Sequence, residues 1–270
     1  MKLTDVLAHL EANKSEMDFL KTGFSKLDND LDGGLLRKEL VVIGGRTGIG
    51  KSYLAAQLLL NIARQGFKTA YFSLEISNEM VVSRLLGALS NIKSTRVRSG
   101  LLSLLELQQL TDSKAKLKAY ENFMMFYDDL YQLEAIKKEI KINQNEFVVV
   151  DFIQNIMVPG ADEYNRLSYV ALELQKLAKE ANCCVLVLSQ LSNTVTREGM
   201  DSPVVEYKGS GNIATVCDLG FFIHRQQSVT PGQFDTLQLA LKKNRRGTSQ
   251  TYDDLVFQQP GGWIYEQTEG

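Results

Sequence analysis

One short segment constrains this chain more than any other feature. Residues Gly45-Arg46-Thr47-Gly48-Ile49-Gly50-Lys51-Ser52 match the pattern G-x-x-x-x-G-K-[ST]. The apolar run 40–43 precedes the segment, and a helical pattern from Ser52 to about Gln65 follows it. Glycines let the backbone wrap phosphates with successive N–H groups pointing inward, and the dipole of the following helix strengthens the attraction. The segment therefore predicts a strand–loop–helix unit that binds phosphate.

The lysine and the serine of this segment have separate expected roles. Lys51 is expected to reach the β- and γ-phosphates of a nucleotide, and the Ser52 hydroxyl to ligate Mg²⁺. A dinucleotide-binding loop of the pattern G-x-G-x-x-G is disfavoured, because Tyr53 stands where its third glycine would be. The alternative is a glycine-rich turn whose lysine is merely solvated.

From Gly23 onward, strand patterns alternate with helix patterns. This alternation implies a mostly parallel sheet with helices on both faces, and the successive strands at the end indicate an antiparallel edge. The predicted fold class is therefore α/β. Strands are expected at 40–43, 68–74, 123–127, 147–152, 185–190, 219–224, 236–243, 254–257 and 263–265, and helices at 52–65, 78–90, 104–119, 130–142 and 166–182.

Three polar residues stand at the ends of apolar strand patterns. Asp151 follows Phe147-Val148-Val149-Val150, Glu75 follows the strand after the phosphate loop, and Gln190 ends the pattern 185–190. Ligands bind at the carboxyl ends of parallel strands, so these side chains are expected beside Lys51. Asp151 is the expected Mg²⁺-side carboxylate, Glu75 the base for an attacking water, and Gln190 a sensor of the γ-phosphate. The alternatives are a carboxylate that caps a strand end, an acid at a helix N-terminus and a polar strand end.

Several motifs in their order along the chain resemble the replicative hexameric DNA helicase family of the DnaB type. The resemblance covers about Thr22 to the C-terminus and implies a RecA-like P-loop core, a hexameric ring, ATP at each subunit interface and single-stranded DNA in the channel. The matching motifs are Thr22-Gly23-Phe24-Ser25-Lys26-Leu27-Asp28, Phe72-Ser73-Leu74-Glu75, Val150-Asp151-Phe152-Ile153-Gln154, Leu188-Ser189-Gln190-Leu191 and Lys243-Asn244-Arg245-Arg246-Gly247.

The resemblance also implies roles for single residues. Glu75 resembles the catalytic glutamate of the family, Gln190 its γ-phosphate-coupling residue, and Lys243 with Arg245 the basic pair that reaches a neighbour's ATP. A cation supplied in trans would stabilise the charge that develops on the γ-phosphoryl group. The alternative for the segment 242–247 is a solvated basic turn between strands.

The polar stretch from Leu191 to Val216 is the expected DNA loop. The family has an Arg-Glu-Ser-Gly pattern there, and this chain has Lys208-Gly209-Ser210-Gly211, which lacks the acidic residue. Arg197, Lys208, Gly209 and Gly211 are the candidate DNA-binding residues, through basic side chains and backbone N–H groups that meet phosphates. The alternative is a surface loop with incidental charges.

Composition bounds the partners and the compartment. A formal net charge of −2 excludes a polycation that coats nucleic acid over its whole surface, but permits a local basic loop. Apolar runs are too short to span a bilayer, so no membrane partner is expected. The three cysteines form no CxxC pattern and predict free thiols in a reducing cytoplasm.

The expected organisation is a linker-type helix and linker over residues 1–21 and a RecA-like ATPase motor domain over 22–270. The family usually carries an N-terminal helical domain that recruits primase, and residues 1 to about 20 resemble its linker alone. A loader or a primase is a candidate partner.

The leading functional hypothesis is an ATP-driven translocase and helicase motor on single-stranded DNA in replication. The alternative is a RecA-like ATPase that loads or remodels a protein partner without unwinding activity, and a strand-exchange recombinase comes third. A regulator that binds nucleotide without turnover is disfavoured by the set Lys51, Glu75, Asp151 and Arg245.

Overall fold

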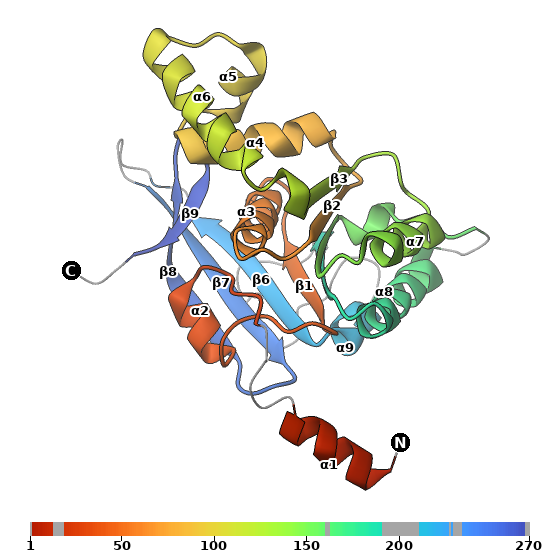
Figure 1. The fold of residues 1–270 in the computed structure, drawn as a ribbon. Helices are drawn as coiled ribbons and strands as arrows, with labels where there is room; N and C mark the ends of the chain where they lie inside the picture. The colour runs from red at the N-terminus through yellow and green to blue at the C-terminus, as the bar shows by residue number, and fades with distance from the viewer. Residues whose placement is uncertain are drawn as a thin grey trace.

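The computed structural model describes residues 2–12, 19–159, 163–190, 211–226, 228 and 234–267. Within these ranges, nine strands form one twisted sheet in the order β3-β2-β4-β5-β1-β6-β7-β8-β9 (Figure 1). The strands are β1 (Leu40–Gly45), β2 (Thr69–Ser73), β3 (Met124–Tyr127), β4 (Phe147–Asp151), β5 (Cys184–Gln190), β6 (Leu219–Gln226), β7 (Asp235–Asn244), β8 (Gln250–Gln258) and β9 (Trp263–Glu266).

The sheet is parallel from β3 to β6 and antiparallel from β6 to β9. This arrangement confirms the predicted α/β class with an antiparallel edge. The carboxyl ends of β1, β2, β4 and β5 consequently meet at one edge of the sheet, where the sequence places its polar strand ends.

Alternate residues of the central strands face two separate apolar layers. Val41 and Ile43 of β1 pack into one cluster, and Leu40 and Val42 into the other. The first layer is covered by α2 (Ser25–Asp30) and α3 (Lys51–Ala63), and the second by α7 (Leu133–Asn143), α8 (Glu163–Glu180) and α9 (Gly211–Val216). Burial on both faces explains why these strands read as continuous apolar runs.

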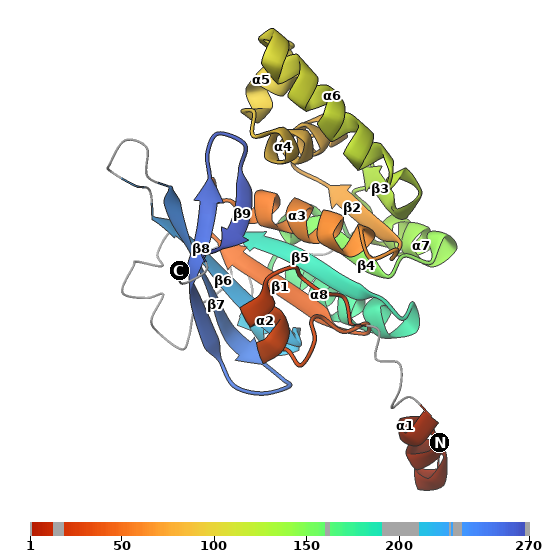
Figure 2. The same cartoon turned by 60° about the vertical axis from the view of Figure 1, so that its left-hand side comes forward.

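Helices α4 (Asn78–Ser90), α5 (Ser94–Ser99) and α6 (Leu104–Lys118) form a projection beyond the sheet, seen at the top of Figure 2. A small apolar cluster of Leu86, Ile92 and Leu110 lies within this projection. Helix α1 lies apart from the sheet at the other end of the molecule (Figure 1). The remaining elements are α1 (Leu3–Ala12), η2 (Glu121–Phe123) and η3 (Ile153–Asn155).

Three short helices were not predicted from the sequence. Helices α2, α5 and α9 span six residues each, less than two turns, so each carries little periodic signal. Helix α9 also corrects the expected extent of the polar loop, because Gly211 begins a helix instead of continuing a flexible segment. Ile213 and Cys217 are fully buried and dock this helix into the second apolar layer.

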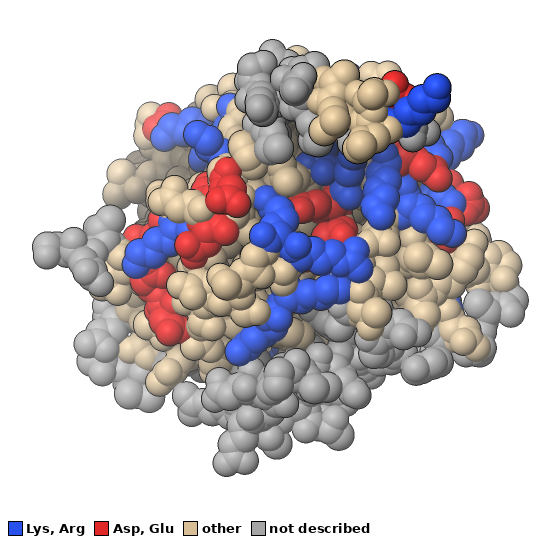
Figure 3. All heavy atoms as spheres, turned by 90° about the horizontal axis from the view of Figure 1, so that it is seen from below, with Lys and Arg blue, Asp and Glu red and all other residues tan. Residues whose placement is uncertain are grey.

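Surface charge is mixed. Seen from below, lysine and arginine side chains gather in bands beside acidic groups (Figure 3), which agrees with local basic patches on a chain of net charge −2. The three cysteines are free and buried. Of the helices within the described ranges, none has the length and apolar character needed to cross a membrane.

Candidate nucleotide-binding site

A cavity of about 240 Å³ opens at the carboxyl edge of the parallel strands. It brings together most of the residues that the sequence predicts for phosphate binding, metal binding and catalysis. The predicted residues that line the cavity are Thr47, Gly48, Gly50, Lys51, Ser52, Glu75, Asp151 and Gln190.

The phosphate loop runs directly from β1 into α3. Gly48 and Gly50 have φ angles of 77° and 116°, a backbone region that suits glycine, so the spacing of the motif reflects the shape of the loop. The Lys51 side chain is 8% exposed, and its Nζ donates to the carbonyl oxygens of Gly45 and Arg46 at 2.8 and 2.9 Å. Burial lowers the pKa of Lys51, while the charges of Asp151 and Glu75 act against this shift.

Asp151 ends β4 and is almost fully buried, with 2% exposure. Its backbone carbonyl accepts a hydrogen bond from the Leu74 N–H at 2.8 Å, and its Oδ2 accepts from the Tyr71 hydroxyl at 2.7 Å. Asp151 and Ser52 thus present a carboxylate and a hydroxyl to one cavity. Oxygen donors of this kind are the ligands that Mg²⁺ prefers, so the residues fit the predicted cation.

Glu75 follows β2, is exposed and lines the cavity. Asn155 Nδ2 donates to the carbonyl oxygen of Leu74 at 2.8 Å and so anchors the backbone just before it. Ser77, not Glu75, caps α4 by accepting a hydrogen bond from the Met80 N–H. Partial desolvation and then the Asp151 charge raise the pKa of Glu75, while Lys51 and Arg84 act to lower it.

Gln190 ends β5, and the side chain of Gln154 holds its backbone. Gln154 Nε2 donates to Ser189 Oγ at 3.0 Å and to the Gln190 carbonyl at 3.4 Å, and its Oε1 accepts from the Gln190 N–H at 3.5 Å. The segment after Asp151 therefore supports two other strand ends, Glu75 through Asn155 and Gln190 through Gln154. This supporting role was not recognised from the sequence, where Gln154 counted only as part of a matching motif.

One wall of the cavity contains aromatic and arginine side chains that the sequence analysis missed. The Tyr53 and Phe257 rings meet edge to face with centroids 5.3 Å apart. Arg84 lies over the Tyr53 ring at 5.1 Å, and Arg225 over the Phe257 ring at 3.8 Å. Arg84, Arg225 and Tyr53 line the cavity. They come from separate elements, and no spacing in the sequence links them.

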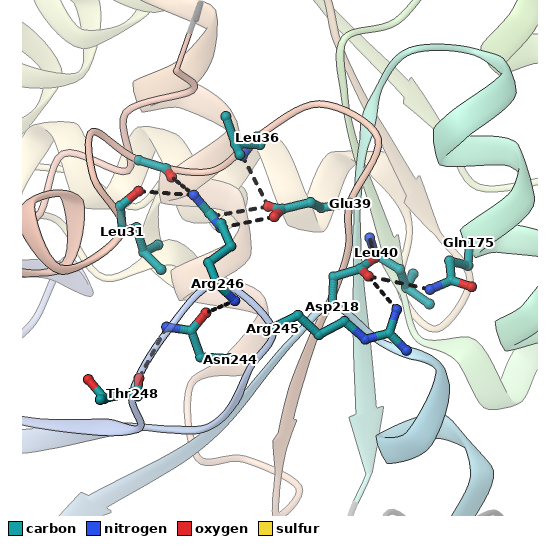
Figure 4. Close-up of polar contacts among 11 residues, drawn as sticks. Leu31, Leu36, Glu39, Leu40, Gln175, Asp218, Asn244, Arg245, Arg246 and Thr248 are labelled. Atoms are coloured by element: carbon teal, nitrogen blue, oxygen red, sulfur yellow. Dashed lines mark hydrogen bonds and ion pairs between the residues drawn. The ribbon is translucent and has the colours of Figure 1, made fainter. Parts of the chain in front are cut away.

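Lys243 and Arg245 lie at the opposite edge of the sheet from this cavity. Asn244 pairs with Leu219, and Leu219 pairs with Val41, which places the turn beside the start of β1 (Figure 4). Arg245 Nη1 lies 2.8 Å from an Asp218 carboxylate oxygen. Arg245 Nη2 and Lys243 Nζ both donate to the Thr215 carbonyl oxygen, at 3.1 and 2.6 Å. This pair is therefore not part of the chain's own nucleotide cavity.

Arg246 turns the other way and anchors the same turn to the body of the protein (Figure 4). Its Nη1 donates to the carbonyl oxygens of Leu31 and Gly34 at 2.9 and 3.1 Å, and its Nη2 donates to Glu39 Oε2 at 3.0 Å. The alternative of a solvated basic turn therefore does not describe Arg246, which is half-buried in a polar network, although the side chain of Arg245 is 46% exposed. The remaining site predictions concern the DNA loop: Arg197, Lys208 and Gly209 lie outside the described residues.

Comparison with known proteins decides the family. The model of the DnaB-like helicase C-terminal domain family matches residues 20–261. This chain belongs to the DnaB-like helicase family. The resemblance found in the sequence is thereby confirmed over most of the chain.

Relatives of this DnaB-like chain include the replicative DNA helicase DnaB of Treponema pallidum (strain Nichols), which is 32% identical over 91% of the chain and 56% of that relative. DnaB of Geobacillus stearothermophilus is 27% identical over 90% of the chain and 56% of that relative. The chain thus spans just over half the length of these relatives.

Two solved structures show the same fold as this DnaB-like chain. An isolated ATPase domain has a TM-score of 0.84 and 20% identity, over 98% of this chain and 97% of that one. A DnaB-like replicative helicase studied with primase has a TM-score of 0.85 and 20% identity, over 98% of this chain and 68% of that one. The predicted RecA-like P-loop architecture is confirmed by these likenesses.

Proposed function

We propose that this chain is the motor of an ATP-dependent DNA helicase, which hydrolyses ATP at subunit interfaces of a hexameric ring and translocates on single-stranded DNA during replication. One observation carries the proposal: the phosphate loop, two carboxylates and a strand-end amide share one cavity, while the basic pair lies at the opposite edge. Membership in the DnaB-like family supports it.

The cavity residues divide the work of ATP binding and hydrolysis. Lys51, already held at the phosphate loop, would exchange its bonds to loop carbonyls for bonds to the β- and γ-phosphates. Glu75, with its raised pKa, would take the proton of the attacking water. Gln190, whose backbone Gln154 holds, would sense whether the γ-phosphate is present.

Ser52 and Asp151 would hold Mg²⁺, which when bound neutralises the charge of the phosphate oxygens. Both residues line the cavity, and Asp151 is held by contacts to the neighbouring strand. The cation site is thus proposed between the carboxyl end of β4 and the first turn of α3.

Lys243 and Arg245 would act on the nucleotide of a neighbouring subunit. Both residues lie beside the start of β1, while the chain's own cavity lies at its end. They would therefore contribute to catalysis in trans, at the cavity of another subunit. Arg245 would stabilise the transition-state charge, so that hydrolysis depends on assembly.

Single-stranded DNA would contact Arg197, Lys208, Gly209 and Gly211 from each subunit. A loader or a primase would bind the assembled ring. We further propose that residues 22–270 form the motor, that residues 1–21 act as linker, and that the protein works in the cytoplasm, in keeping with its three free thiols.

The test is the ATPase rate with and without single-stranded DNA, measured across protein concentration. A motor of this kind should hydrolyse ATP faster when single-stranded DNA is added. Its ATPase rate per subunit should also rise as subunits assemble. Displacement of one strand from a forked duplex then separates a helicase from a plain translocase. An ATPase rate that changes with neither single-stranded DNA nor protein concentration would contradict the proposal. It would favour an ATPase that remodels a protein partner.

A further inference from the structure

The hydroxyl of Tyr71 reaches a residue of the nucleotide site, although Tyr71 lies within an apolar strand pattern of the sequence. Tyr71 sits in β2 and is fully buried. Its Oη donates to Asp151 Oδ2 at 2.7 Å. Tyr71 thus contacts Asp151, one of the two residues to which the proposed function assigns the cation.

The ring and the hydroxyl of Tyr71 do different things. The ring belongs to the apolar layer under α3 and stacks near Phe126, with centroids 6.4 Å apart. A phenylalanine would fill the same space. The hydroxyl alone reaches Asp151, and a buried hydroxyl is costly unless it is hydrogen-bonded.

The Tyr71 hydroxyl donates its hydrogen bond to one oxygen of the Asp151 carboxylate. Asp151 then keeps its second oxygen for the cavity, which Ser52 also lines.

We propose that Tyr71 is a positioning residue for the magnesium site: its hydroxyl fixes the carboxylate of Asp151. The inference rests on the proposed function, which supplies the cation. Tyr71 does not line the cavity, and it acts through Asp151 as outer-shell partners of metal sites do.

The test compares Tyr71→Phe with Tyr252→Phe. Tyr252 is also buried and its Oη donates to Asp30 Oδ2 at 2.9 Å, so the control loses a matching tyrosine–aspartate hydrogen bond outside the cavity. Binding of a fluorescent ATP analogue is measured in EDTA and then over a Mg²⁺ titration, together with turnover and melting temperature.

Tyr71→Phe should bind the analogue in EDTA as the parent does, but require about tenfold more Mg²⁺ for half-saturation, as loss of an outer-shell partner does. Excess Mg²⁺ should restore its turnover, which would not happen if the variant were simply misfolded. Tyr252→Phe should keep the parent's Mg²⁺ requirement. In an Asp151→Asn background, Tyr71→Phe should add little, because its effect passes through Asp151.

An unchanged Mg²⁺ requirement in Tyr71→Phe, beside a parent that responds to Mg²⁺, would overturn the role of Tyr71 alone. Full additivity with Asp151→Asn would also overturn it. If the parent itself binds nucleotide without any response to Mg²⁺, the proposed function fails, and the role of Tyr71 falls with it.

Discussion

At the scale of single residues, the site balances one buried cation against two carboxylates. Lys51 is mostly buried, and its pKa is lowered by burial but supported by Asp151 and Glu75. Glu75 in turn has its pKa raised by desolvation and by Asp151, and lowered by Lys51 and Arg84. The pKa values of Lys51 and Glu75 thus both respond to the neighbouring charges, which makes single substitutions here informative about chemistry.

Glu75→Gln should separate nucleotide binding from turnover. The amide keeps the size of the side chain but accepts no proton, so we expect Mg-ATP to bind while hydrolysis slows about 100-fold or more. Equilibrium binding and steady-state ATPase measurements check this. Tight binding with unaltered turnover would remove Glu75 from the role of base.

Arg84→Ala should move the acid limb of the pH profile. Arg84 favours the ionised form of Glu75, so its loss should raise the pKa of Glu75 further and shift the acid limb of kcat/KM to higher pH. Arg84→Lys, which keeps the charge, is the control and should leave the limb near its original position. The same acid limb in Arg84→Ala and the parent would show that Glu75 does not control it.

At the scale of elements, the basic turn after β7 divides its cations between two tasks. Arg246 points into the body and meets Glu39, while Arg245 and Lys243 stay at the surface on the Thr215 carbonyl. Burial raises the pKa of Glu39 despite the charge of Arg246, so the pair fixes geometry more than it adds stability.

Glu39→Ala should destabilise the protein by about 3 kcal/mol, because it leaves a half-buried guanidinium without its carboxylate. Urea unfolding measures the change. Glu180→Ala is the control: it breaks the exposed pair with Lys141, 2.8 Å apart, and should leave the midpoint of urea unfolding nearly unchanged. Equal effects of the two substitutions would contradict the anchoring role of Arg246.

Most main strands and long helices were predictable from the sequence because they bury an apolar run or face, whereas α6 buries only Leu110 and Ser113. Helix α4 begins and ends where its pattern predicts, at Asn78 and Ser90. Helices α2 and α9 were not predictable, since docking of a few residues such as Leu27 or Ile213 sets them, and the equally short α5 buries none of its residues. The predicted site residues that line the cavity were found through the phosphate-loop motif or at a strand end. Tyr71 and Arg84 could not be found this way, because a tyrosine in an apolar strand looks like core and an arginine in a helix looks solvated.

At the scale of the whole molecule, the nucleotide cavity lies at the carboxyl ends of the parallel strands. Lys243 and Arg245, the cations proposed to act in hydrolysis, lie at the opposite ends of the same strands. A subunit on its own therefore holds an incomplete catalytic set under the proposed function. This arrangement makes activity a property of the junction between subunits.

Mixing two inactive variants should restore activity if the cations act in trans. Arg245→Ala should bind nucleotide almost normally but turn over on the order of 10³-fold more slowly, and Lys51→Ala should lose both binding and turnover. A mixed assembly contains junctions at which an intact phosphate loop meets an intact Arg245. The ATPase rate of the mixture should therefore exceed that of either variant alone. No recovery in well-mixed assemblies would place Arg245 in cis or outside catalysis.

The opposite placement of cavity and cations also limits the symmetry of any productive assembly. A two-fold dimer uses the same surface patch on both copies, so a patch that holds only the cavity, or only the cations, would complete no catalytic set. A head-to-tail contact, in which one face of each copy meets the other face of the next, joins the two parts. Contacts of this kind leave a free face at each end of any open chain, and they either close on themselves by rotation or continue as a helical filament.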